Sequence, residues 1–363
     1  MLQDVSDSDI SWIGSVQASL MLLIGVASGP LFDAGFFRTL LATGGFLLVF
    51  GMFMTSICTE YWQVMLAQGV AVGLGGGCLA TPSIAIVSTY FSTRKSIAIG
   101  MVAAGSGVGG VVYPIAFAQL QPRIGFGWAT RVIAFIILVT MLVSAAVMRV
   151  RLLPAKRRRL LDPRAFLEIP FTMIVIGFFF GAMGVYIPFF YIGSYSTDKT
   201  TMSDNLAFYM LVVMNTGSVF GRLIPNFVAD RTGPLNVMLP FSLFTTVVAF
   251  SWVAVNNTAG IIVFAIFYGF LSGTYVSLPG ATIVSLSPDL HVIGARIGMC
   301  FFVGGLGLLV GTPVAGAILQ SYGWLGTQLF CGACLAASTV AILGCRLSRS
   351  LELTEKLWGH IKV

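Results

Sequence analysis

Long apolar runs separated by short polar connections make up most of this chain. A bilayer core of about 30 Å needs about twenty apolar residues, because a helix rises about 1.5 Å per residue. Eleven stretches of the sequence meet that length, and the pattern therefore predicts an all-α polytopic membrane protein. The predicted spans are residues 11–31, 39–59, 63–85, 97–118, 126–148, 171–192, 207–228, 237–255, 259–282, 298–319 and 325–345.

Composition supports this class and excludes others. Of 363 residues, 57% are hydrophobic and only 9% are charged, whereas an ordinary soluble domain is about 25% charged. The two histidines are His291 and His360, too few for a metal cluster. Cys331-x-x-Cys334 lies in an apolar run, where helix packing is the main interpretation and a redox or metal site the alternative. No nucleophile–base set is visible, so we expect neither an enzyme nor a cofactor.

A glycine motif raises the alternative of nucleotide binding. Gly105, Gly107 and Gly110 form a G-x-G-x-x-G pattern. A dinucleotide loop needs a preceding strand and an acidic residue about twenty positions later. No Asp or Glu occurs between Glu60 and Asp162, so the nucleotide interpretation fails. Small residues four apart instead allow two helices to approach closely in lipid. The predicted packing glycines are Gly69, Gly73, Gly77, Gly105 and Gly109.

Positively charged residues predict the orientation in the membrane. Alternate connections carry most of the Lys and Arg, whereas the other side has only Arg123, Arg131 and Lys199. The N-terminus is therefore predicted outside and the C-terminus in the cytoplasm, with the plasma membrane as the expected location. The basic linker 149–170 is interpreted as a cytoplasmic topology anchor, with a lipid-headgroup or regulatory site as the alternative.

An internal repeat divides the chain. Asp33 and Asp230 lie 197 positions apart, each in an Asp-then-Gly turn, and Pro82 and Pro279 match at the same offset. The tripeptide Ile-Gly-Met recurs at 99–101 and 297–299. We expect two homologous halves. The predicted domains are an N-terminal bundle (1–148), the linker (149–170), a C-terminal bundle (171–345) and a cytoplasmic tail (346–363).

Several segments resemble the major facilitator superfamily, and more narrowly the fungal branch of its monocarboxylate porter family. They include "SDISWIGSVQASL", "GPLFDAGFFR", "GRLIPNFVADRTGPLN" and "YGFLSGTYVSLPGA". The resemblance covers essentially the whole chain and implies two six-helix bundles that rock about a central site. It also implies twelve helices, so the chain is expected to lack the first. The signature of drug–proton antiporters is absent from 100–114.

Paired charges at predicted cytoplasmic helix ends suggest a gate. Asp33 and Arg38 in one half correspond to Asp230 and Arg231 in the other. An Asp there can accept hydrogen bonds from the N-terminus of a neighbouring helix and pair with an Arg across the gate. The alternative is a turn cap with a solvated charge.

Arg222 is the candidate for anion recognition. A cation within a span is costly and suggests a functional site, although the side chain could instead extend to the interface. In the family that this chain resembles, the matching arginine pairs with a carboxylate four residues earlier. That position is Ser218 here, which puts proton coupling through the pair in doubt. An organic anion remains a suitable ligand.

The other candidates for the substrate path are uncharged. Aromatic and amide side chains suit an amphipathic, ring-bearing solute, although each tyrosine has helix packing as its alternative. These candidates are Gln17, Gln68, Tyr186, Tyr191, Asn215, Tyr268 and Tyr275. Asn256 begins an N-glycosylation sequon on the predicted external side.

Taken together, these features predict a secondary active transporter that moves an organic acid or related small metabolite. Export of a secondary metabolite is favoured, because Ser218 lacks the carboxylate expected of proton-linked uptake. The alternatives are uptake of a monocarboxylate or vitamin, and a non-transporting receptor or truncated remnant. The expected partners are the small-molecule substrate (an organic anion or amphipathic metabolite), membrane lipids and protons as a candidate coupling ion, with no nucleic acid.

Overall fold

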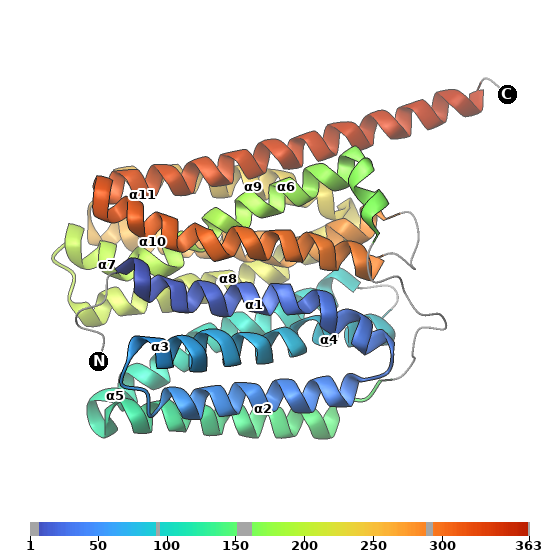
Figure 1. The fold of residues 1–363 in the computed structure, drawn as a ribbon. Coiled ribbons are helices and arrows are strands. Elements are labelled where there is room, and N and C mark those ends of the chain that lie inside the picture. Colours follow the sequence, from blue (N-terminus) through green and yellow to red (C-terminus); the bar gives the residue numbers. More distant parts are fainter. Residues whose placement is uncertain (1–6, 92–94, 151–161, 288–292, 362–363) are drawn as a thin grey trace.

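A computed structural model describes residues 7–91, 95–150, 162–287 and 293–361 of the chain, and all regular structure in these ranges is helical (Figure 1). Residues 7–150 are called the N-terminal half below, and residues 162–361 the C-terminal half. The helices are α1 (Asp7–Asp33), α2 (Phe37–Thr55), α3 (Tyr61–Val64), the π-helical η1 (Met65–Val72), α4 (Gly73–Tyr90), α5 (Lys95–Val147), the 3-10 turn η2 (Pro163–Leu167), α6 (Ile169–Val185), α7 (Ile187–Lys199), α8 (Asp204–Thr232), α9 (Pro234–Ser251), the 3-10 turn η3 (Trp252–Ala254), α10 (Thr258–Leu286) and α11 (Ile293–Ile361).

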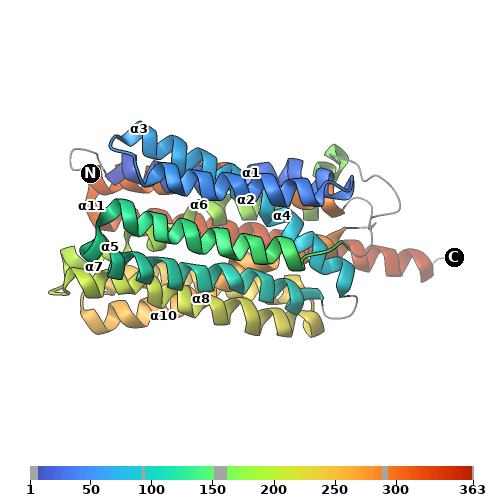
Figure 2. The same ribbon diagram turned by 90° about the horizontal axis from the view of Figure 1, so that it is seen from below.

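Within the described ranges, nine continuous helical stretches are long and apolar enough to cross a membrane. Two of them are too long for one crossing, because α5 has 53 residues and α11 has 69. Each contains one glycine with non-helical dihedral angles, Gly125 in α5 and Gly323 in α11. The ribbon reverses at these glycines, so α5 and α11 each have two arms that run antiparallel (Figures 1 and 2).

Glycines with positive φ recur at one spacing in the two halves. Gly35 (φ 92°) and Gly233 (φ 93°) end α1 and α8, and Gly125 (φ 76°) and Gly323 (φ 69°) reverse α5 and α11. Both pairs are separated by 198 positions. Residues with a Cβ rarely adopt this region, so glycine is needed at all four turns.

The two halves meet along two pairs of helices. α1 packs against α11, and α5 packs against α8 (Figure 2). Buried hydroxyl groups join the first pair. Ser15 and Thr312 share a hydrogen bond, and the Ser19 hydroxyl donates to the carbonyl oxygen of Gly305 at 2.7 Å. Because hydrocarbon offers these polar groups no other partner, such bonds favour close contact between the halves.

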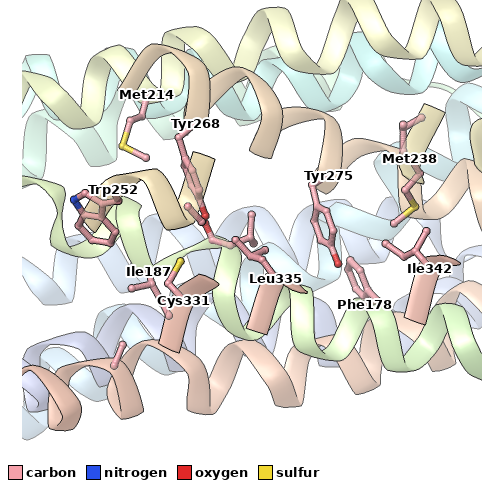
Figure 3. Close-up of a cluster of buried hydrophobic side chains, with 14 of the residues drawn as sticks. Phe178, Ile187, Met214, Met238, Trp252, Tyr268, Tyr275, Cys331, Leu335 and Ile342 are labelled. Atoms are coloured by element: carbon pink, nitrogen blue, oxygen red, sulfur yellow. The ribbon is translucent and has the colours of Figure 1, made fainter. Parts of the chain in front are cut away.

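The hydrophobic core is unevenly divided between the halves. The large cluster in Figure 3 belongs to the C-terminal half and includes Trp252, Tyr268 and Leu335, whereas the N-terminal half has only small clusters. In the candidate spans of the N-terminal half, 17% to 33% of residues are buried, against 39% to 67% in those of the C-terminal half. The N-terminal half therefore presents more apolar surface without a protein partner.

Close packing at the predicted glycines is found at some positions and not at others. α1 lies directly against Gly69, Gly73 and Gly77. A Cβ at Gly105 would meet no other atom within 4 Å, and a Cβ at Gly109 would meet only Tyr113 of its own helix. The prediction for Gly105 and Gly109 is therefore wrong for the helices described. The face of α5 that contacts α8 carries Gly107 and Gly110 instead, near Val219 and Asn215.

The tightest helix contact involves glycines that the sequence analysis did not select. Gly217 and Gly221 of α8 face α10, and Gly269 and Gly273 of α10 face α8. A Cβ at any of the four would fall on backbone atoms of the other helix. Gly269 and Gly273 stand 196 positions after Gly73 and Gly77, which contact α1 in the same way.

Candidate functional site

Arg222 lies in α8 at the contact with α5, and only 8% of the residue is exposed. Its Nη1 donates to the carbonyl oxygen of Ala103 at 2.6 Å and also to the hydroxyl of Ser106. Its Nε is buried and has no hydrogen-bond partner among the described residues. Within the described ranges Arg222 forms no ion pair. The site thus presents a buried positive charge with one unused donor, which is suited to an anion.

Ser218 and Asn215 lie on the same helix, one and two turns before Arg222. Ser218 is 1% exposed and contacts Gly273 of α10, so it offers Arg222 no partner. The Asn215 side-chain amide donates to the carbonyl oxygen of Leu211 at 3.0 Å, beside Gly110 of α5. Asn215 is therefore at the α5–α8 contact, while Ser218 is inside the C-terminal half.

Asn226 is a polar neighbour that the sequence analysis missed. It is fully buried one turn after Arg222, and its Nδ2 donates to the Arg222 carbonyl oxygen at 2.7 Å and to Ser277 Oγ at 2.8 Å. In the part of the chain that the structure describes, its Oδ1 has no hydrogen-bond partner. The sequence does carry a signal for Asn226: it is an amide in the middle of an apolar helix, four residues after the intramembrane arginine.

Tyr186 and the two glutamines are partly buried. Tyr186 separates α6 from α7 and interacts electrostatically with Arg222. Gln17 lies on α1, and Gln68 lies in the π-helical segment η1. Short π-helical stretches are frequent at functional sites. Interrupted helices are tolerated at membrane depth where protein surrounds them or where they line a cavity.

Three predicted path tyrosines lie in the core. Tyr268 donates to the carbonyl oxygen of Val185 at 3.0 Å, and Tyr275 to that of Gly177 at 3.0 Å. Both are at most 2% exposed and lie among apolar side chains (Figure 3). The assignment of Tyr268 and Tyr275 to the substrate path is corrected to core packing, because their hydroxyls are already bonded within the C-terminal half. Tyr191 is also buried, and donates to the carbonyl oxygen of Thr312 at 3.0 Å.

Asp230 joins the two halves at the end of the bundle that carries the linker, called the linker end below. Its two carboxylate oxygens accept hydrogen bonds from the backbone N–H groups of Ser96 and Ile97, both at 3.1 Å. These residues form the first turn of α5, where N–H groups are free and an anion is stabilised. Arg231 is exposed and lies over the Phe227 ring of its own helix, 4.7 Å from its centroid. Arg38 is exposed, and the side chain of Asp33 lies outside the described residues.

A buried ion cluster at the linker end was also missed. Arg296 of α11 is 3% exposed, and its Nε donates to Asp162 Oδ2 at 3.1 Å. Its two terminal nitrogens donate to the two carboxylate oxygens of Glu168, at 2.8 and 2.5 Å. The cluster ties the start of α11 to η2 and α6. The sequence gives no signal for it, because Arg296 is more than 120 positions from both carboxylates.

The remaining candidates are the two cysteines of the C-x-x-C motif and the glycosylation sequon. Cys331 and Cys334 are buried free thiols, and Cys331 Sγ donates to the carbonyl oxygen of Gly184 at 3.5 Å. In the part of the chain that is described, no group of three or more His, Cys, Asp or Glu residues is placed to hold a metal ion. Asn256 is exposed in the connection before α10, with its Oδ1 3.5 Å from the Tyr195 hydroxyl.

Comparison with known proteins identifies the family. The model of the Major Facilitator Superfamily matches residues 1–289. The chain belongs to the major facilitator superfamily. It is 43% identical over 330 residues to "MFS-type transporter dbaD" of Emericella nidulans, an alignment that covers 90% of this chain and 74% of the relative. It is 37% identical over 348 residues to "Aspyridones efflux protein apdF" of the same organism, covering 95% of this chain and 71% of the relative.

The fold of this superfamily member is also found among solved structures. The fucose:proton symporter FucP of E. coli is similar with a TM-score of 0.67 and 14% identity, covering 94% of this chain and 92% of FucP. That likeness concerns the fold alone. With the family and its relatives, the apolar helices indicate a multi-pass membrane transporter and not an enzyme.

Proposed function

We propose that this transporter exports an organic acid or a related secondary metabolite by alternating access. The observation that carries the proposal is Arg222, a buried cation whose Nε has no partner and which forms no ion pair within the described ranges. Support for the direction comes from apdF, which is named as an efflux protein for aspyridones. A metabolite carboxylate would supply the negative charge that Ser218 cannot.

Recognition at this site would compete with the contact between the halves. Arg222 donates to Ala103 and Ser106 of α5 through Nη1, so a carboxylate that draws the guanidinium toward itself weakens the α5–α8 contact. We assign Asn215 and Tyr186 to the sides of the same pocket, and Gln17 and Gln68 to the facing part of the N-terminal half. Binding of the anion would thereby favour the change of state that transport requires.

Asp230 is proposed as the gate at the linker end. Its bonds to Ser96 and Ile97 connect α8 to the first turn of α5, and separation of the halves on that side must break them. The repeat assigns Asp33 and Arg38 the equivalent role in the other half. Arg231 lies beside Asp230 and would adjust the local charge.

The linker end is proposed to face the cytoplasm, because most of the Lys and Arg residues gather there. The plasma membrane is the location that suits export from a cell. In this orientation Asn256 lies on the external side, and its sequon is a proposed glycosylation site.

The fold is proposed to have twelve membrane crossings in two pseudo-symmetric halves, of which this chain supplies eleven. If each arm of α5 and α11 crosses once, the nine continuous stretches of the described ranges correspond to eleven crossings. Glycine turns 198 positions apart support the pseudo-symmetry. In the C-terminal half, α6 packs against α11, whereas the corresponding surface of α5 around Gly105 is open. A further helix encoded upstream would cover that surface.

Two alternatives follow from specific observations. Uptake of a monocarboxylate or vitamin is the alternative direction, supported by the resemblance to the fungal branch of the monocarboxylate porter family. A non-transporting receptor or remnant is the alternative class, supported by the open surface of the N-terminal half. Ser218 in place of a carboxylate favours export over proton-linked uptake.

The proposal is tested by deleting the gene in its source organism and restoring it either unchanged or as Arg222→Gln. Mass spectrometry of the medium and of the cells then gives the ratio of external to internal amount for each acidic metabolite. Export predicts that at least one carboxylate accumulates inside the deletion strain and leaves again only with the unchanged gene. A carboxylate that instead declines inside the deletion strain would indicate uptake, and no change in any metabolite would favour the receptor or remnant.

A further inference from the structure

A small cavity at the linker end is lined by neither Arg222 nor the gate residue Asp230. It has a volume of about 240 Å³ and lies between the start of α9, the end of α10 and the last part of α11. Its lining comprises two cations, two polar residues and four other residues at the helix ends, namely Arg346 and Arg349, Asn236 and Ser285, and Gly233, Pro234, Leu235 and Leu286. Binding pockets for drug-sized ligands run from about 300 to 1,000 Å³, so this cavity suits a smaller group.

The charges in the cavity favour an anion. Arg346 and Arg349 are partly buried and stand three residues apart on α11, so both guanidinium groups lie on one face. Arg346 forms no ion pair with any residue that the structure describes. The start of α9 adds to this field, because no side chain caps it and its first N–H groups carry partial positive charge.

The surface beside the cavity is apolar. Leu343, Leu347 and Leu351 recur every four residues along α11 and are 43%, 57% and 67% exposed. They lie within the apolar stretch that is long enough to cross a membrane, next to the face that carries the two arginines. A ligand at this place meets cations with one part and hydrocarbon with the other. An anionic phospholipid has both parts, whereas a soluble phosphate has only one.

We propose that this cavity binds the phosphate of an anionic phospholipid, with the arginine pair holding the headgroup and the leucines of α11 contacting the acyl chains. The lipid would then bridge α9, α10 and the end of α11, which extends beyond the rest of the bundle (Figure 1). Basic pockets between transmembrane helices are suited to such headgroups.

The test compares lipid stabilisation of the purified chain in detergent. Phosphatidylglycerol in phosphatidylcholine micelles is titrated while the melting temperature is followed by tryptophan fluorescence. In the double variant Arg346→Gln/Arg349→Gln, the half-saturating phosphatidylglycerol concentration should rise about 30-fold, since each basic residue near a membrane surface contributes about 1 kcal/mol. The matched control is Arg149→Gln/Arg164→Gln, which removes two exposed arginines from the same end and should leave the concentration nearly unchanged.

A second variant tests the site independently, in case the double variant fails to fold. Ser285→Phe fills the cavity but keeps both arginines, and it should abolish the phosphatidylglycerol effect as the double variant does. Equal loss in the cavity and control variants, or no loss in either, would overturn the site. Inorganic phosphate is titrated in parallel, and should stabilise neither the unchanged chain nor the control. Stabilisation by phosphate as strong as that by phosphatidylglycerol would overturn the lipid as the ligand.

Discussion

Arg222 has an energetic cost in the folded protein, and the proposed function gives it a use in transport. A charged side chain in the middle of a spanning helix costs about 2.5 to 3.5 kcal/mol on insertion scales. A hydrogen bond to a charged group returns about 1.5 to 3 kcal/mol. The two bonds to Ala103 and Ser106 are therefore enough to offset the cost, and the fold tolerates the cation without a carboxylate. The unpartnered Nε remains for a ligand.

A serine substitution tests whether the ligand and α5 compete for this guanidinium. Ser106→Ala removes one bond across the α5–α8 contact, so the guanidinium is freer to bind a carboxylate. We expect the apparent affinity for an anionic substrate to rise about fivefold, corresponding to about 1 kcal/mol. The measurement is the concentration dependence of transport. Ser144→Ala is the control, because Ser144 is partly exposed on α5 and donates only to its own helix, to the carbonyl oxygen of Thr140. Weaker binding in Ser106→Ala would contradict the competition.

The sequence could predict Arg222 but not its surroundings. An arginine within an apolar run is visible to inspection, and its cost in lipid is general. Its partners Ala103 and Ser106 lie more than 115 positions away, so only the packed helices bring them together. Tyr268 and Tyr275 were misassigned for a related reason. A tyrosine in a span can face a cavity or a core, and helical periodicity does not distinguish the two when the helix is apolar on all sides.

Among the helices, the importance of a glycine depends on whether another helix packs against it. Gly221 of α8 lies against α10 so closely that a Cβ would overlap the carbonyl oxygen of Phe270, whereas Gly105 of α5 faces open space. Alanine has the better intrinsic helix propensity at both positions, by about 1 kcal/mol. The two sites therefore differ in packing and not in propensity.

This difference gives a paired prediction for stability. Gly221→Ala should lower the melting temperature by several degrees, because overpacking costs about 1 to 3 kcal/mol or more. Gly105→Ala should be neutral or slightly stabilising in the present chain. Thermal unfolding in detergent measures both. In a product extended upstream by one apolar span, Gly105→Leu should become destabilising if that span covers α5. Equal tolerance of Gly105→Leu in both products would contradict the proposed twelfth helix.

Two of the spans predicted from hydropathy lie inside longer helices of the structure. The predicted span 207–228 lies inside α8 (Asp204–Thr232), and 259–282 lies inside α10 (Thr258–Leu286). Helices continue past the hydrocarbon core, and their ends are fixed by caps such as Asn257, whose side chain accepts from the Gly260 N–H at 2.7 Å. The sequence predicts two spans where α5 reverses, because polar residues interrupt the apolar run before Gly125.

For the whole molecule, the two interfaces between the halves are the contacts that a rocking motion of the halves has to change. α1 with α11 and α5 with α8 form the main contacts between the two bundles, so rocking of one half on the other would change these contacts first. The bonds of Asp230 to α5 lie at the linker end, and the bond between Gln119 and the Tyr209 hydroxyl (3.1 Å) lies at the opposite end. Contacts at both ends have to break and re-form in turn during a transport cycle.

The orientation of the whole molecule makes a separate prediction. A cysteine introduced at Ala155 in the linker should resist a membrane-impermeant thiol reagent in intact cells, whereas one at Thr200 should react. The reason is the excess of basic residues on the linker side. Permeabilised cells are the control, in which both positions should react. Labelling of Ala155→Cys and protection of Thr200→Cys in intact cells would reverse the assigned topology and, with it, the positions of the gate and the lipid cavity.

The most direct measurement of the central claim is transport into inside-out membrane vesicles, in which export appears as uptake. A carboxylate metabolite identified by the deletion experiment is compared with its methyl ester in the unchanged protein, in Arg222→Gln and in Arg222→Lys. Losing a charge-assisted hydrogen bond should reduce uptake of the acid about tenfold or more in Arg222→Gln and leave the ester nearly unchanged. Arg222→Lys should also impair the acid, because an ammonium lacks the planar fork of the guanidinium. Arg131→Gln, at a distant arginine that lies over the Trp128 ring, is the control for charge removal. Equal loss of acid and ester in Arg222→Gln at normal expression would contradict anion recognition by Arg222.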